Sequence, residues 1–139
     1  MLFGGCRASY GPGMSKVALF RMIVDIEVTH VEGVKGLVAE ASAISRSEPG
    51  TLMYDWYLDE DSGRARLHEA YDSFESLDAH TSGPVFTELG PRLFEVAQFV
   101  HIDFSGDMPL ERQHDDEPLA PLTVWGSRIA SVDDQSSKS

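Results

Sequence analysis

The chain has little positive charge and no long apolar run, and each shortage excludes a class of partner. Lys and Arg number 11 against 23 Asp and Glu, which gives a formal net charge of −12. Nucleic-acid binding needs clustered Lys and Arg to neutralise phosphates, so nucleic acid is not an expected partner. No apolar run approaches the roughly 20 residues that span a bilayer, so no membrane insertion is expected.

Cysteine is represented by Cys6 alone, so the chain cannot form an intramolecular disulfide. The opening residues also lack the basic start and the sustained apolar run of a signal peptide. These two absences predict a cytoplasmic protein, because disulfides and signal peptides accompany secretion.

Most familiar catalytic motifs are missing as well. The chain contains no Gly-rich phosphate or dinucleotide loop, no CxxC pair, no GxSxG elbow and no HExxH. The acidic run "HDDE" at 114–117 is typical of solvated charge, so we expect no metal site there. Any chemistry must therefore depend on groups outside these motifs.

Length and composition predict one domain with tails. A chain of 139 residues with 42% hydrophobic content can bury one core. We expect a leader at 1–16, a folded domain at 17–110 and an acidic Pro/Ser-rich tail at 111–139. The tail holds one apolar stretch, "LTVW" at 122–125, and the sequence leaves open whether it docks on the body, on a partner subunit or only loosely.

Hydrophobic periodicity predicts an alternation of strands and helices. A strand at 17–28 is followed by a helix with capping-box spacing at Thr29 and Glu32 that ends near Ser47. A hairpin of two strands spans 51–71, and Asp72 then has the position of a cap for a short helix. Glycine and proline at 82–84 and at 90–91 should interrupt the helical segment that leads to a last strand, "QFVHIDF".

The order strand, helix, strand, strand, helix, strand predicts an α+β, ferredoxin-like fold. Its four-stranded antiparallel sheet should carry the helices on one face. The other face would expose Leu19, Ile23, Met53 and Tyr57, which are too apolar to stay in contact with water. We therefore predict a homodimer that forms through the sheet faces.

Two polar residues are expected inside the layer between helices and sheet. Glu69 alternates with Leu67 and Tyr71 on the third strand, and His80 follows Leu77 at helical spacing, so both should point inward. A buried carboxylate needs a partner or a chemical role. The alternative is structural, because a Glu hydrogen-bonded to a Tyr or His can simply join a sheet to a helix. Tyr54 and Trp56, on the neighbouring strand, complete the wall or belong to the core.

These residues also form a familiar pattern. The segment "EPGTLMYDWYLDEDSGRARLHEAY", followed by "SLDAH" and "PVF", resembles the antibiotic biosynthesis monooxygenase domain family across about 17–109. The matching positions are Glu48, Pro49, Gly50, Tyr54, Glu69, Tyr71, His80 and Phe86. The resemblance implies a dimeric α/β barrel built from ferredoxin-like protomers.

The resemblance also implies an activity. Members of the family oxidise small phenolic, quinol or anthrone-like molecules with O₂ and without a cofactor. On this reading His80 is the catalytic base or proton shuttle, and Glu69 orients it or a substrate hydroxyl. The substrate-binding residues would be Tyr54, Trp56, Tyr71 and Phe86.

Two other functions are compatible with the same fold. Haem-degrading relatives use an Asn, a Trp and a His around the porphyrin, whereas this chain has no Asn and places Tyr71 at the position of that Trp. Haem degradation therefore ranks low. A non-catalytic dimer that binds a small ligand or serves a stress response would share the fold, so topology cannot separate it from an enzyme.

Overall fold

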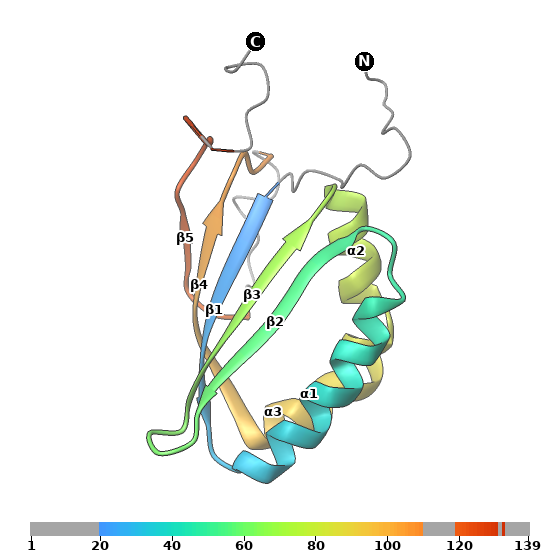
Figure 1. Ribbon diagram of the computed structural model, residues 1–139, viewed down its shortest axis with the longest axis vertical. Coiled ribbons are helices and arrows are strands. Elements are labelled where there is room, and N and C mark those ends of the chain that lie inside the picture. The colour runs from blue at the N-terminus through green and yellow to red at the C-terminus, as the bar shows by residue number, and fades with distance from the viewer. Residues whose placement is uncertain (1–19, 110–118, 131, 133–139) are drawn as a thin grey trace.

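One five-stranded sheet is covered on one face by helices, as Figure 1 shows. The computed structural model describes residues 20–109, 119–130 and 132. The elements follow the order β1 (Phe20–Val28), α1 (Val31–Arg46), β2 (Thr51–Asp59), β3 (Arg64–Tyr71), α2 (Phe74–Ser82), the π-helix η1 (Val85–Leu89), α3 (Gly90–Val96), β4 (Ala97–Ser105) and β5 (Leu122–Val124). This confirms the predicted α+β, ferredoxin-like class.

The sheet order is β2-β3-β1-β4-β5. The first four strands are antiparallel, as predicted, and β5 is an added strand that pairs in parallel with β4. Trp125 extends this contact, since its backbone N–H donates to the Phe104 carbonyl and its indole N–H to Asp103. The apolar stretch at 122–125 therefore docks on the body of the same chain. Leu19, which was expected on the open sheet face, and the acidic run at 114–117 lie outside the described residues.

The core lies between the sheet and the helices because each strand alternates apolar side chains toward that layer. On β1 the buried residues are Phe20, Val24 and Ile26. The helices bury Val34, Leu37 and Ala41 from α1, with Val85, Leu89 and Leu93 from η1 and α3. A second cluster of Phe20, Tyr71 and Phe104 packs beneath the start of α2.

Helix caps differ from those that the sequence predicts. His30, not Thr29, caps α1, because its Nδ1 accepts the Gly33 backbone N–H at 2.9 Å. Ser73, not Asp72, caps α2 by accepting the Ser76 N–H. Each true cap stands one residue later than the predicted one, where an extended backbone lets the side chain reach the first turn.

The interruption predicted at Gly90-Pro91 takes the form of a change in helix type. The chain is π-helical from Val85 to Leu89 and α-helical from Gly90. Pro91 stands in the first turn of α3, directly after this change in helix type.

The open face of the sheet is mixed rather than uniformly apolar. Tyr57 is 58% exposed there, and its ring lies edge-on to that of His68. Beside them, Arg66 forms an ion pair with Asp25 at 2.8 Å. The homodimer through this face stays a prediction.

Candidate functional site

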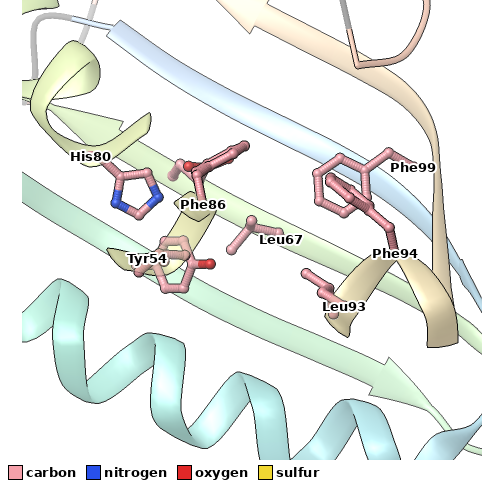
Figure 2. Close-up of a pocket in the computed structure, with 9 residues that line it drawn as sticks. Tyr54, Leu67, His80, Phe86, Leu93, Phe94 and Phe99 are labelled. Atoms are coloured by element: carbon pink, nitrogen blue, oxygen red, sulfur yellow. The ribbon is translucent and has the colours of Figure 1, made fainter. Parts of the chain in front are cut away.

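A small cavity lies between β3, β2 and the helices, and Figure 2 shows the His80 imidazole at one end of it, near Tyr54 and Phe86. Its volume is about 30 Å³. The walls are Tyr54, Leu67, Glu69, His80, Val85, Phe86, Leu93, Phe94 and Phe99. The polar groups gather at one end and the phenylalanines of α3 and β4 form the other.

His80 is the most enclosed polar group of the site. It is 1% exposed, and its ring lies 5.3 Å from that of Tyr54 and 5.7 Å from that of Phe86. Its Nδ1 lies 2.8 Å from Oε1 of Glu48, which precedes β2. Its Nε2 is buried and has no hydrogen-bond partner among the described residues. One side of the imidazole thus faces a carboxylate, and the other side faces no hydrogen-bonding group of the described residues.

Glu48 is itself held in place. The Thr51 hydroxyl donates to the same Oε1 at 2.8 Å, and the Glu48 side chain is 19% exposed. The turn at 48–51 closes with a backbone hydrogen bond from Thr51 to the Glu48 carbonyl. The carboxylate therefore reaches His80 from a rigid turn at the start of β2.

Glu69 has a different partner from the one that the resemblance suggested. The Tyr71 hydroxyl donates to Glu69 Oε1 at 2.5 Å, on the same face of β3. Burial raises the pKa of the Glu69 carboxyl, although the Tyr71 hydrogen bond and the nearby His80 oppose this rise. Burial, followed by the charge of Glu69, also raises the pKa of Tyr71 and of Tyr54. Both phenols accordingly remain protonated at neutral pH.

The structure brings four of the predicted residues to the cavity wall: Tyr54, Glu69, His80 and Phe86. Tyr71 lies behind the wall and is 0% exposed, while Trp56 lies edge-on to the Tyr54 ring at 6.3 Å. Sequence reasoning assigned no role to Glu48, which is 32 positions from His80. The available signal was the "EPG" of the family pattern, which places a carboxylate just before β2.

The raised pKa of Glu69 predicts how stability changes with pH. Because the fold disfavours the ionised carboxyl, the free energy of unfolding should fall as pH rises from about 4.5 through the folded-state pKa. Glu69→Gln keeps an oxygen that can accept from Tyr71 but cannot ionise. Chemical denaturation across this range should therefore show a smaller decline for Glu69→Gln than for the wild type.

The matched control is Glu95→Gln, which makes the same charge change at an exposed site on α3. Its free energy of unfolding should fall with pH as that of the wild type does. Equal pH profiles of stability for Glu69→Gln and the wild type would contradict the raised pKa of Glu69.

The fold and the site together define a class of protein: a ferredoxin-like α+β domain with a carboxylate–imidazole pair beside a helix–sheet cavity. The model of the family "Antibiotic biosynthesis monooxygenase" matches residues 24–90, and this segment of the chain belongs to that family. The comparison with curated proteins gave no match.

Solved structures share the fold at low sequence identity. MupZ from Pseudomonas fluorescens is 18% identical with a TM-score of 0.61, over 81% of this chain and 94% of that one. A structure described as an antibiotic biosynthesis monooxygenase is 22% identical with a TM-score of 0.54, over 65% of this chain and 99% of its own. Rv0793 from Mycobacterium tuberculosis is 18% identical with a TM-score of 0.52, over 65% and 96%. At these identities the likeness concerns the fold alone.

Among the described residues, no helix combines the length and apolarity needed to cross a bilayer, and no cluster of His, Cys, Asp and Glu has the makings of a metal site.

Proposed function

We propose that this domain is a cofactor-independent monooxygenase that acts on a small, uncharged phenol, quinol or anthrone. The observation that carries the proposal is the buried imidazole of His80, whose Nδ1 faces Glu48 while its Nε2 has no partner among the described residues. A neutral imidazole held in this way has a lone pair on Nε2 that can accept a proton from a substrate hydroxyl or an acidic C–H.

The chemistry needs little else from the protein. Removal of the proton gives an electron-rich aromatic anion that reduces O₂ directly. One oxygen atom enters the substrate and the other leaves as water, and the substrate supplies all the electrons. Apolar walls such as Leu67 and Leu93 favour this step by excluding bulk water from the anion. Tyr54, whose phenol stays protonated, can donate a hydrogen bond to the developing oxyanion.

The cavity must widen to admit a ring. Its volume of about 30 Å³ suits water, whereas a cavity of about 150 Å³ holds benzene. Phe94, at the outer end, is 45% exposed and can rotate away without unfolding the core. Phe86 stands on the π-helical segment η1, and π-helical turns are frequent at functional sites. Both phenylalanines are therefore the side chains that substrate would displace, and Trp56 and Tyr71 would support the binding wall from behind.

The small volume favours a second candidate function. A domain whose cavity never opens would be a non-catalytic protein that binds its ligand elsewhere or serves a stress response, with Glu69, Tyr71 and His80 in structural roles. Homodimerisation through the open sheet face and a cytoplasmic location are compatible with either candidate.

Aerobic incubation with hydroquinones and anthrones tests the proposal, with O₂ uptake recorded by an oxygen electrode. Each neutral compound should be paired with a carboxylated or sulfonated analogue. We expect O₂ uptake proportional to protein concentration for neutral compounds and little for anionic ones. None of the described residues that line the cavity is Lys or Arg, and the chain carries a net charge of −12. Uptake no faster than the buffer control across the whole panel would reject the monooxygenase and favour the second candidate.

A further inference from the structure

Glu48 has the geometry of a group that sets the protonation pattern of His80. A neutral imidazole carries one proton, and a carboxylate beside one ring nitrogen holds the proton on that nitrogen. Glu48 Oε1 lies 2.8 Å from Nδ1, while Nε2 has no partner among the described residues. A hydrogen bond from Nδ1–H to this carboxylate would leave the lone pair on Nε2.

We propose that Glu48 is a positioning residue that keeps His80 in the Nδ1–H tautomer, with an unprotonated Nε2 at the cavity. The inference deepens the proposed function, since it names the residue that would make His80 a base. Carboxylates hold imidazole bases in one tautomer in proteins of unrelated folds, where loss of the carboxylate yields the wrong tautomer.

Two further observations favour Glu48 over the other buried carboxyl. Glu69 already accepts the Tyr71 hydroxyl, and burial disfavours its ionised form. Glu48 is fixed by the Thr51 hydroxyl on the same oxygen that faces His80, so the carboxylate cannot rotate away without losing both contacts. The two carboxyl groups therefore have separate tasks: Glu48 faces the imidazole, and Glu69 is joined to Tyr71.

The turn geometry also ties His80 to β2. His80 belongs to the second turn of α2, and the helix start is joined to β2 by the Asp72 N–H, which donates to the Gly50 carbonyl at 3.1 Å. Glu48 and Gly50 belong to one short turn, so the position of the carboxylate and that of the helix are set together. A carboxylate fixed in this position can set the orientation of the imidazole ring as well as the nitrogen that carries its proton.

Nitrogen-15 NMR of histidine-labelled full-length protein reports the tautomer without any substrate. In the wild type we expect the His80 shifts of a protonated Nδ1 and an unprotonated Nε2. In Glu48→Gln the amide can either accept from or donate to Nδ1, so the Nε2–H tautomer should become populated. Glu95→Gln, an exposed change of the same charge, should leave the His80 shifts as they are in the wild type.

Wild-type shifts of an Nε2–H tautomer, or a Glu48→Gln spectrum equal to that of the wild type, would overturn the inference. Circular dichroism and a denaturation midpoint for each variant identify any that is misfolded. If Glu48→Gln is misfolded, Thr51→Val takes its place, because it removes only the second contact of Glu48 and should also populate the Nε2–H tautomer.

Turnover gives an independent measurement. With a substrate found in the O₂ assay, Glu48→Gln should lower kcat at least about tenfold and change KM little, because the loss concerns proton transfer and not substrate contact. Equal kcat values in the variant and the wild type would contradict the positioning role. If no compound is oxidised, the proposed function fails while the NMR result still decides the tautomer.

Discussion

His80→Ala is expected to lower O₂ consumption by about 10²- to 10⁴-fold, the usual loss when a general base is removed. Among the described residues of the cavity wall, the substitution deletes the one imidazole and leaves Glu69 as the remaining carboxyl group. Glu69 is a poor substitute, because its Oε1 already accepts from Tyr71. Initial rates with the best neutral substrate measure the effect.

A loss of turnover through misfolding can be separated from a loss of chemistry. His30→Asn removes an exposed imidazole at the start of α1 but keeps a side chain that caps helices well, so it should retain full activity. Added imidazole should restore part of the activity of His80→Ala, since the deleted ring leaves a space of its own shape. A His80→Ala protein that folds and consumes O₂ at the wild-type rate would remove His80 from the mechanism.

Most of the fold follows from local periodicity. Alternating apolar residues identify β1 and β3, and the helical spacing of Val34, Leu37 and Ala41 identifies α1, because these patterns decide which face is buried. Sequence could not predict β5, whose three residues pair in parallel with β4 across a connection that includes 110–118, which lie outside the described residues. So short a strand has no periodicity of its own.

The sequence predicts the individual residues of the site but not the contacts between them. Inward positions for Glu69 and His80 follow from strand and helix spacing. Which carboxylate meets the imidazole depends on how the turn at 48–51 lies against α2, a contact between residues far apart in sequence. Phe94 and Phe99 likewise line the cavity only because α3 and β4 meet there.

Gly50→Ala should destabilise the fold by about 1–3 kcal/mol and disturb the site at the same time. An added Cβ would overlap the Ser76 hydroxyl, lie 2.5 Å from the Ser76 Cβ and 2.6 Å from Oδ1 of Asp72. Because Ser76 is part of α2, the helix must shift away from β2, and His80 must move with it. Urea denaturation should show the lost stability, and the NMR shifts of His80 should depart from those of the wild type.

Gly36→Ala is the matched control, and it should raise the stability of the protein where Gly50→Ala lowers it. Gly36 is exposed on α1 and has no atom within 4 Å of an added Cβ, so alanine should stabilise the helix by up to about 1 kcal/mol. Adding Ser76→Gly to Gly50→Ala removes two of the three close contacts and should restore part of the stability and of the His80 shifts. A Gly50→Ala protein as stable as the wild type, with unchanged His80 shifts, would show that the turn at 48–51 adapts without moving α2. The contact between this turn and α2 would then not be what holds Glu48 and His80 together.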